Sequence, residues 1–340
     1  MKDQDSDPFG EAADFRVSGP FHLLGARFRF ESNSAELLEL AGHAYAGLPR
    51  HRFDTPAPEM RIRLLLTSGT RNRQGPVRAR TRRHREPPPL QMLSGAGFLG
   101  GATESSNAVV ISPRERAALV IVAPQMLSYP YHTRYELIEF AVFTLAVRVQ
   151  QLASLHGACV GIGGRGVLLM GDSGAGKSTV ALQCLLEGFE FLSEDSVFVA
   201  PESLRATGVA NFLHVRAESL RWVQAARDVA YIRKSPTIRR RSGVTKFEVD
   251  LRQGDYRLAS SPLQIGATVF LSARKAGAQP LLQPLARSEL LQRLAAAQGY
   301  AANLPGWATL KRKLAGAGAF ELRRGSHPRE AAAALRQLME

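Results

Sequence analysis

The chain has 340 residues, of which 45% are hydrophobic and 22% are charged. This length predicts two domains, each able to bury a core of its own. No apolar run approaches the roughly 18 residues that a membrane-spanning helix needs, so we expect no span. Residues 1–14 are polar, with five acidic side chains and one lysine, which is unlike a signal peptide and favours a cytoplasmic protein.

Cysteine usage points to the same compartment. The sequence has two cysteines, Cys159 and Cys184, which fall in a predicted buried strand and a predicted buried helix. We therefore expect structural thiols in a reducing cytoplasm, and neither a disulfide scaffold nor a cysteine metal site.

The formal net charge of +14 is concentrated in a few segments. Seven arginines lie between Arg71 and Arg85. A basic stripe of this kind can bind nucleic acid through its phosphates. The run contains no interleaved aromatic side chains for base stacking, however, so we favour a solvated basic loop over residues 70–90.

The first half of the chain is predicted to be a small α+β domain over residues 19–130, after a disordered segment at 1–18. Ser34 can cap a helix from Ala35 to about Ala46, because apolar residues then recur on one side. Nothing in this half indicates catalysis. The predicted extended segments are Phe21–Phe30, Arg61–Thr67, Gln91–Leu99, Ala108–Ile111 and Ala117–Val122.

A long helix is predicted from Tyr135 to Ala153, apolar nearly all round at its centre and therefore buried. It leads into an apolar strand that contains His156, and Gly163-Gly164 then turn the chain back in a hairpin. A lone histidine is more often a satisfied structural side chain than a catalytic one, so this pattern alone leaves both roles of His156 open.

Residues 171–178 read G-D-S-G-A-G-K-S, which matches the phosphate-binding P-loop pattern G-x-x-x-x-G-K-[ST], also called Walker A. The short apolar run 167–170 before it predicts a buried strand, and 179–186 after it predicts a helix. Strand, glycine loop and helix form the context that the pattern requires. The alternative is a glycine-rich turn that matches by chance, which both flanks disfavour.

The loop predicts a nucleotide site. Its glycines allow a tight turn whose N–H groups face an anion, at the positive end of the following helix. Lys177 can reach the outer phosphates of ATP, and the Ser178 hydroxyl can bind Mg²⁺. The predicted nucleotide-binding residues are Gly171, Asp172, Ser173, Gly174, Ala175, Gly176, Lys177, Ser178 and Thr179.

An acidic pair, Glu194-Asp195, follows the apolar run Phe189–Leu192. A helix of about 12 residues rises about 18 Å, and a return strand of about five residues covers roughly 16 Å. The pair should therefore return to the level of the phosphate loop, at the carboxyl end of a parallel strand. Two carboxylates there can divide the tasks of holding Mg²⁺ and accepting a proton. The alternative is a solvated acidic turn.

The remainder of the chain continues the α/β pattern. A basic segment, residues 233–246, could close over the nucleotide or receive an acidic substrate. Its candidates are Arg239, Arg240, Arg241 and Lys246, and the sequence does not distinguish among them. The predicted strands are 197–199, 208–215, 247–251, 267–271 and 319–322, and the predicted helices are 218–226, 288–297 and 328–339.

Three features together resemble the catalytic domain of bacterial HPr kinase/phosphorylase. His156-Gly157 precedes the first loop glycine by fifteen residues, and the acidic pair lies seventeen and eighteen residues past Lys177. The chain resembles more closely the HPr-kinase-related proteins, which join this domain to a different N-terminal half. The motif match covers about residues 150–200. The chain departs from the usual pattern at Glu194, where HPr kinases have aspartate, and at Thr179, where they have an acidic residue.

The resemblance implies a fold similar to phosphoenolpyruvate carboxykinase, in a P-loop kinase domain over residues 131–340. It implies that Lys177 and Ser178 bind phosphate and Mg²⁺. It also implies that Glu194 and Asp195 supply a metal ligand and the catalytic base, with Asp195 favoured as the base. His156 would support the phosphoryl site.

We therefore expect an ATP- and Mg²⁺-dependent phosphotransferase, an HPr-kinase-like serine kinase. Its acceptor would be a hydroxyl of a protein, a peptide or a small molecule. Two other classes stay open: a non-catalytic ATP-binding regulatory protein, and a basic nucleic-acid-binding protein with a nucleotide site. The acidic pair favours the kinase, since a binding module does not need two carboxylates. A homo-oligomeric state also stays open.

Overall fold

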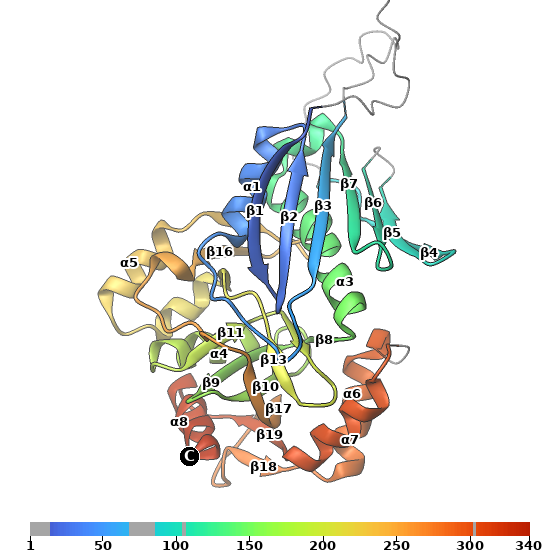
Figure 1. Ribbon diagram of the computed structural model, residues 1–340. Coiled ribbons are helices and arrows are strands. Elements are labelled where there is room, and N and C mark those ends of the chain that lie inside the picture. The colour runs from blue at the N-terminus through green and yellow to red at the C-terminus, as the bar shows by residue number, and fades with distance from the viewer. Residues whose placement is uncertain (1–13, 68–85, 104–106, 302–303) are drawn as a thin grey trace, which may run out of the picture. The chain divides into compact units, whose positions relative to one another are not determined.

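The computed structural model describes residues 14–67, 86–103, 107–301 and 304–340 (Figure 1). It is a mixed α/β protein whose internal contacts divide it into two compact units, and the division falls within one helix, α3 (Glu139–Gln150). The first unit comprises Met1–Phe21, Arg27–Ala46 and Glu59–Leu145, and the second comprises His22–Ala26, Gly47–Pro58 and Ala146–Glu340.

The first unit is built on a seven-stranded sheet with the order β1-β2-β3-β7-β6-β5-β4. β3 pairs in parallel with β2 and β7, and the strands from β7 to β4 pair antiparallel. Buried and exposed side chains alternate along β2, as expected when one face of a sheet covers a core. The strands are β1 (Arg16–Leu23), β2 (Ala26–Ser32), β3 (Glu59–Leu66), β4 (Gln91–Gly95), β5 (Phe98–Ala102), β6 (Ala108–Ser112) and β7 (Ala117–Val122).

Helix α1 (Ala35–Tyr45) confirms the predicted helix and its cap. The Ser34 hydroxyl accepts a hydrogen bond from the Leu37 N–H at 3.4 Å, which satisfies one of the free donors of the first turn. The helical elements that follow the sheet are η1 (Pro124–Ser128), α2 (Pro130–His132), the π-helical η2 (Thr133–Ile138) and α3.

Three predictions for this half are wrong in detail. The extended segment predicted at Gln91–Leu99 is interrupted, because Ala96 and Gly97 take positive φ angles between the antiparallel strands β4 and β5. The strand predicted at Phe21–Phe30 is two strands, because Leu24 and Gly25 take positive φ angles of 52° and 82° and reverse the chain. The disordered segment predicted at 1–18 overlaps β1, which begins at Arg16; residues 1–13 lie outside the described part of the chain. Most of the predicted basic loop 70–90 also lies outside it, since the description stops at 67 and resumes at 86.

The second unit contains a nine-stranded sheet and a separate three-stranded sheet. The larger sheet has the path β11-β9-β10-β17-β13-β12-β8, with β19 pairing with both β17 and β18. Its strands are β8 (Ala153–His156), β9 (Ala158–Ile162), β10 (Arg165–Met170), β11 (Glu190–Ser193), β12 (Ser196–Val199), β13 (Arg205–Thr207), β17 (Leu263–Lys275), β18 (Leu282–Pro284) and β19 (Ala319–Arg324).

The smaller sheet has the order β14-β16-β15 and is antiparallel throughout. Its strands are β14 (Phe212–Val215), β15 (Thr237–Arg239) and β16 (Thr245–Asp250). The helices of the second unit are α4 (Lys177–Leu186), α5 (Ala226–Lys234), α6 (Arg287–Ala297), α7 (Trp307–Ala317) and α8 (Pro328–Met339), with the short η3 (Ala217–Trp222), η4 (Leu251–Gln253) and η5 (Gly299–Ala301).

Strand β10 lies inside the larger sheet and is buried on both faces. It pairs in parallel with β17 and antiparallel with β9, which confirms the predicted hairpin. Because side chains alternate along a strand, Val167 and Leu169 enter one hydrophobic cluster while Leu168 and Met170 enter another. The strand that carries the phosphate loop is therefore fixed from both sides.

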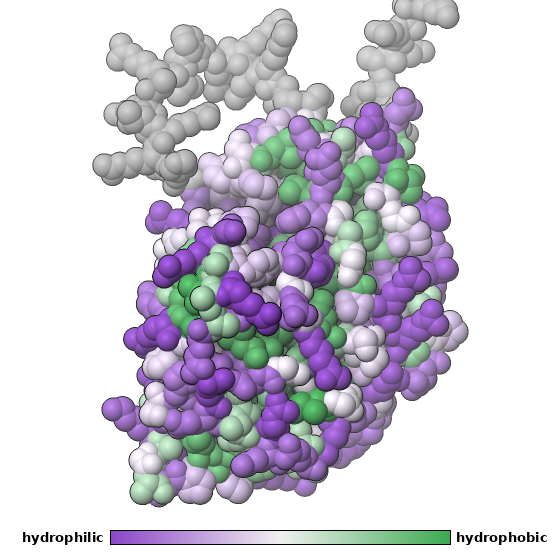
Figure 2. Space-filling view, turned by 90° about the vertical axis from the view of Figure 1, so that its left-hand side faces the viewer, coloured by the Kyte–Doolittle hydropathy of each residue, from purple (hydrophilic) through white to green (hydrophobic). Residues whose placement is uncertain are grey.

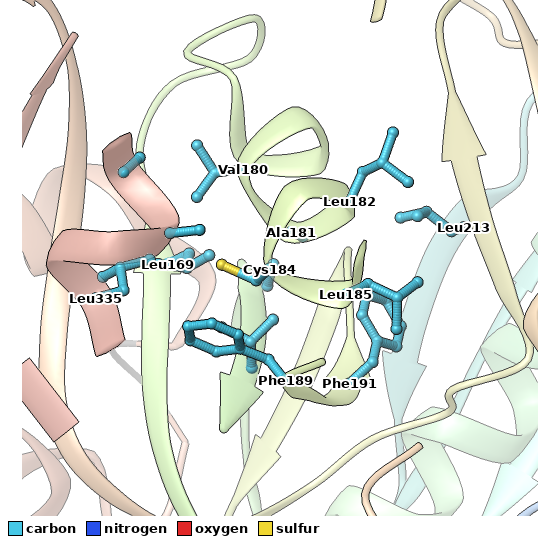
Figure 3. Packing of buried hydrophobic residues seen from close by; sticks show 14 of the residues in the cluster. Leu169, Val180, Ala181, Leu182, Cys184, Leu185, Phe189, Phe191, Leu213 and Leu335 are labelled. Atoms are coloured by element: carbon cyan, nitrogen blue, oxygen red, sulfur yellow. The ribbon is translucent and has the colours of Figure 1, made fainter. Parts of the chain in front are cut away.

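Helix α4 packs its apolar side chains into the first of these clusters (Figure 3). In this cluster Cys184 lies beside Leu169 of β10, and Leu185 lies beside Phe191 of β11; each buried leucine or phenylalanine contributes roughly 1.5–3 kcal/mol. Cys159 and Cys184 are both free and buried, as predicted, and burial raises the pKa of both thiols.

The long helix predicted at Tyr135–Ala153 is correct at its centre and wrong at its ends. Its first part is the π-helical η2, which is continuous with the short α2. The helix ends at Gln150 because Gln151 takes a φ of 53°, and Ala153 already belongs to β8. The helix predicted at 218–226 is wrong: residues 217–222 form the 3-10 helix η3, and α5 begins only at Ala226. Helices α5 and α7 and strands β13, β15 and β18 were not predicted, since they are short or weakly periodic.

The surface shown in Figure 2 carries mainly hydrophilic side chains, with hydrophobic ones in smaller patches. Within the described ranges, no helix combines the length and the apolar character needed to cross a membrane.

Candidate active site

The phosphate loop has the backbone geometry that its glycines predict. Gly171, Gly174 and Gly176 have φ angles of 140°, 85° and 107°, which other residues adopt only with strain. A Cβ atom at Gly171 would also lie 3.0 Å from the carbonyl oxygen of Leu271 on β17. The loop then enters α4 at Lys177, so its N–H groups and the helix N-terminus meet at one anion-binding position.

The Lys177 side chain folds back over the phosphate loop and is fixed there by backbone carbonyl groups. Its ammonium donates hydrogen bonds to the carbonyl oxygens of Gly171, at 2.6 Å, and of Asp172, at 3.3 Å. Burial lowers the pKa of Lys177, and the carboxylates of Asp195, Asp172 and Glu194 partly oppose this effect. The lysine is thus a cation in a partly desolvated position beside the acidic pair.

Strand β11 returns the acidic pair to the phosphate loop, as the sequence predicts. The two elements are not neighbours in the sheet: β9 lies between β11 and β10 and is antiparallel to both. β11 therefore runs in the direction of β10, and the residues after both strands lie at the same edge. One cavity is lined by Lys177, Ser178, Glu194 and Asp195.

Glu194 belongs to a buried chain of ionisable groups. Its Oε1 accepts hydrogen bonds from the His214 backbone N–H at 3.1 Å and from His214 Nδ1 at 2.6 Å. His214 Nε2 lies 3.3 Å from Glu248 Oε1, across the β14–β16 pair. Burial alone lowers the pKa of His214, but the charge and hydrogen bond of Glu194, together with Glu248, raise it above its ordinary value.

The second oxygen of Glu194 fits a metal-ligand role. Glu194 Oε2 is buried and has no hydrogen-bond partner within the described residues, which is costly for a carboxylate unless a cation or ligand satisfies it. Among those residues no group of three or more His, Cys, Asp or Glu side chains could hold a metal ion. A cation here would need other oxygens as well, and Mg²⁺ is commonly held by one or two carboxylates plus phosphate oxygens.

Asp195 is positioned by His156 and Arg240. His156 Nδ1 lies 3.3 Å from Asp195 Oδ1 and 3.1 Å from its backbone oxygen. Arg240 donates to Asp195 Oδ2 from two guanidinium nitrogens, at 3.2 and 3.3 Å. With Arg240 on one carboxylate oxygen and His156 on the other, the Asp195 side chain is restrained from both sides in the cavity.

Gln298 fixes the backbone of His156. The Gln298 amide oxygen accepts a hydrogen bond from the His156 N–H at 2.8 Å, and its amide nitrogen donates to the His156 carbonyl oxygen at 2.9 Å. Gln298 as a whole is 1% exposed. Gly157 allows β10 to approach, because a Cβ atom there would lie 2.8 Å from the Leu169 oxygen. The His-Gly pair is thus held on both sides.

The hairpin between β15 and β16 supplies the basic side of the cavity. The cavity is about 240 Å³ in volume, and Arg240, Ser242, Val244 and Lys246 line it from this hairpin. Burial lowers the pKa of Lys246, with opposing effects from Glu194 and Asp195. The remaining lining residues are His156, Ser173, Gly174, Gly176, Lys177, Ser178, Thr179, Glu194, Asp195, His214, Val215, Arg216 and Ser219.

Most predicted site residues meet in this cavity, and a few do not. Of the four basic candidates, Arg240 and Lys246 line it, whereas Arg239 and Arg241 are exposed and do not. Asp172 and Ala175 of the loop do not line it either, and Gly171 faces β17.

Three residues whose hydrogen bonds hold the site were missed from the sequence, His214, Glu248 and Gln298, as were the lining residues Val215, Arg216 and Ser219. His214 lies on β14, whose residues are all buried, and Glu248 lies on β16; a titratable side chain inside an apolar strand pattern was the available signal. Gln298 gave none, since it follows an ordinary helix. Thr179, where an acidic residue was expected by resemblance, has its hydroxyl 3.1 Å from the Ser219 hydroxyl.

Comparison with known families identifies the segment that builds this site. Residues 148–217 match the family model of the HPr Serine kinase C-terminal domain. The chain is 44% identical over 55 residues to HPr kinase/phosphorylase of Lactobacillus delbrueckii, covering 16% of this chain and 17% of that protein. It is 33% identical over 89 residues to the protein of that name from Chlorobium phaeobacteroides, covering 24% and 26%.

The segment matched by the family model, residues 148–217, is a small part of the chain. These matches span about a sixth to a quarter of the curated relatives' length. The match to the solved Hpr(Ser) kinase/phosphatase of Coxiella burnetii covers 54% of this chain and 94% of that chain, at 12% identity and a TM-score of 0.28. Residues 148–217, which contain the phosphate loop and the acidic pair, are thus similar to the HPr Serine kinase C-terminal domain.

Proposed function

We propose that the second unit is an ATP-dependent kinase that transfers the γ-phosphoryl group to a hydroxyl of a protein, peptide or small-molecule acceptor. The observation that carries the proposal is the meeting of the loop lysine, the Ser178 hydroxyl and two carboxylates in one cavity. The loop is sufficient to bind phosphate. Transfer of the phosphoryl group also needs a base that takes the proton of the acceptor hydroxyl.

Each side chain has a task in this chemistry. Lys177 and the loop N–H groups hold the phosphates and offset the negative charge that moves onto the leaving oxygen. Asp195 accepts the proton of the acceptor hydroxyl as the new P–O bond forms, and the bond from the γ-phosphorus to the ADP oxygen breaks. His156 and Arg240 orient the Asp195 carboxylate.

The donor set at the cavity also suits Mg²⁺. Ser178 and Glu194 would hold it, with Asp195 nearby, and its charge would neutralise the phosphate oxygens. Glu194 is suited to this task because Oε1 is committed to His214 while Oε2 is unsatisfied. Glu194 and Asp195 therefore divide metal binding and proton transfer between them.

The proposal is tested by following the labelled phosphate. The protein is incubated with Mg-ATP labelled at the γ-position and with peptide and metabolite fractions, and products are sought by mass spectrometry. We expect a phosphorylated hydroxyl product that disappears with Lys177→Ala. Tight Mg-ATP binding with no labelled product from any fraction would contradict the kinase.

One observation favours a second candidate, a regulatory protein that binds ATP without transferring phosphate. Both close nitrogens of the Arg240 guanidinium lie on Asp195 Oδ2, an oxygen that a base needs to expose. If Arg240 remains paired with Asp195 when ATP is bound, the carboxylate cannot accept a proton. The pair would then change position in response to the γ-phosphate and pass this change to the rest of the protein. In that case Arg240→Ala would change the ATP-induced shift in protease sensitivity while no phosphate transfer occurs in either protein.

A further inference from the structure

A second cavity, about 480 Å³ in volume, adjoins the phosphate loop. Neither Glu194 nor Asp195 lines it. Its size lies in the usual range of small-molecule pockets, roughly 300–1,000 Å³. The residues that line both this cavity and the one that holds the acidic pair are Gly174, Gly176, Thr179, Arg216 and Ser219.

The walls of this cavity suit a flat, partly apolar group. Leu271, Leu322 and Ala331 contribute buried apolar surface. Trp222 and His327 line it as well, with ring centroids 4.8 Å apart in an edge-to-face arrangement. The Arg221 guanidinium carbon lies 4.6 Å from the Trp222 ring centroid. Aromatic and guanidinium planes of this kind stack well on nucleobases.

Hydrogen bonds at the N-terminus of α8 hold the segments that carry Trp222 and His327 in place. Arg329 donates to Gln224 Oε1 and to Glu187 Oε1, both at 2.7 Å, and so ties α8 to the segment after Trp222 and to the end of α4. His327 Nδ1 accepts a hydrogen bond from the Arg329 N–H at 3.0 Å. A neutral imidazole with an accepting Nδ1 carries its proton on Nε2, so His327 retains one donor for a ligand.

We propose that this second cavity binds the base and ribose of the nucleotide, with Trp222 as the stacking surface. The inference rests on the proposed function. If the terminal phosphate faces Asp195, the rest of the nucleotide must leave the loop elsewhere, and this cavity begins at the same glycines. Ser272 and Ser326 line it and supply hydroxyls of the kind that ribose can pair with.

The phosphate acceptor is a less suitable occupant. Its hydroxyl must come within hydrogen-bond reach of the base, about 2.6–3.2 Å. Asp195 lines the first cavity and not the second. An acceptor bound beside Trp222 would have to cross the loop glycines that hold the phosphates.

The test separates the nucleoside from its phosphates. Dissociation constants of Mg-ATP and of Mg-tripolyphosphate are measured by calorimetry for the wild type, Trp222→Ala and Trp222→Phe. We expect Trp222→Ala to weaken Mg-ATP binding about 10-fold to 100-fold, because one base–aromatic stack is lost. Binding of Mg-tripolyphosphate should change less than about twofold, and Trp222→Phe should restore most of the ATP affinity.

The outcomes distinguish this inference from the kinase proposal. Unchanged ATP affinity in Trp222→Ala, or an equal loss for ATP and tripolyphosphate, overturns the nucleoside site even if phosphate transfer continues. A raised KM for the acceptor with unchanged ATP affinity overturns it in favour of an acceptor site. Selective loss of ATP affinity supports it even if no transfer is found. A wild type that binds neither ligand overturns both.

The tryptophans offer a second readout. The chain has two, and Trp307 lies in the core with 6% exposure, away from this cavity. In a Trp307→Phe variant, emission therefore reports on Trp222 alone. We expect Mg-ATP to change that emission and Mg-tripolyphosphate to leave it unchanged; a response to both ligands, or to neither, would contradict stacking on Trp222.

Discussion

At the scale of single residues, His51 makes a pH-dependent contribution that the sequence did not suggest. Its Nε2 lies 2.9 Å from the Ala259 carbonyl oxygen, which can only accept, so Nε2 carries the proton. Nδ1 then accepts from the Thr207 hydroxyl at 2.7 Å. Burial lowers the pKa of His51, and the hydrogen bond to Ala259 only partly offsets this. The folded protein therefore keeps His51 neutral.

The sign of the pH dependence follows from this lowered pKa. Above the unfolded value of about 6.5, neither state is protonated and the stability from His51 is fully present. Below it the unfolded state takes up the proton first, so stability falls by up to about 1.4 kcal/mol per pH unit until the folded pKa is passed.

His51→Gln should remove this contribution. We expect its free energy of unfolding, measured by urea denaturation from pH 8 to pH 5, to fall less steeply than that of the wild type. The control is His43→Gln, since His43 is exposed in the first unit. Equal slopes for the wild type and His51→Gln would show that His51 protonates alike in both states.

Gln298 is a positioning residue whose effect can be separated from nucleotide binding. Gln298→Ala removes both hydrogen bonds to the His156 backbone, and leaving buried partners unpaired costs about 1–3 kcal/mol. We expect slower phosphate transfer with an unchanged dissociation constant for Mg-ATP. Gln264→Ala is the matched control, since that amide is exposed on β17. Parallel losses of affinity and turnover would instead indicate general unfolding of the site.

At the scale of elements, the hairpin β15–β16 brings basic side chains to the cavity. Arg240 and Arg241 are neighbours, but only Arg240 lines the cavity and pairs with Asp195. We expect Arg240→Ala to lower the transfer rate about 10²-fold, as for removal of one preorganised donor. Arg241→Ala should stay within about twofold. A similar loss of transfer rate in both variants would mean that the rate depends on the net positive charge of the hairpin and not on the position of Arg240.

The sequence predicted those elements whose local pattern matches their final role. The phosphate loop, its strand and helix, and the cap at Ser34 all follow from nearest neighbours in the chain. The return of Glu194 and Asp195 followed from helix rise and strand length alone. The contacts of His214, Glu248 and Gln298 with these residues depend on pairing between distant strands and helices, which no local pattern encodes.

At the scale of the whole molecule, the arginine run 71–85 and the phosphate site can be tested separately. Residues 68–85 lie outside the described part of the chain, so the solvated-loop interpretation stays a prediction. We expect deletion of 71–85 to leave Mg-ATP affinity unchanged, because nothing in the run resembles a phosphate cradle. A gel shift with DNA or RNA that falls steeply with salt, and that the deletion abolishes, would favour nucleic-acid binding.

The acidic pair tests the central claim most directly. Asp195→Asn is nearly isosteric and leaves the phosphate loop untouched, so the variant should bind Mg-ATP as the wild type does. If Asp195 is the base, γ-phosphate transfer should fall about 10²–10⁴-fold. If Asp195 instead holds the metal, the Mg²⁺ dependence should shift and Glu194→Gln should show that loss of rate. A double variant, Glu194→Gln with Asp195→Asn, that binds Mg-ATP normally and transfers phosphate at the wild-type rate would contradict the kinase mechanism.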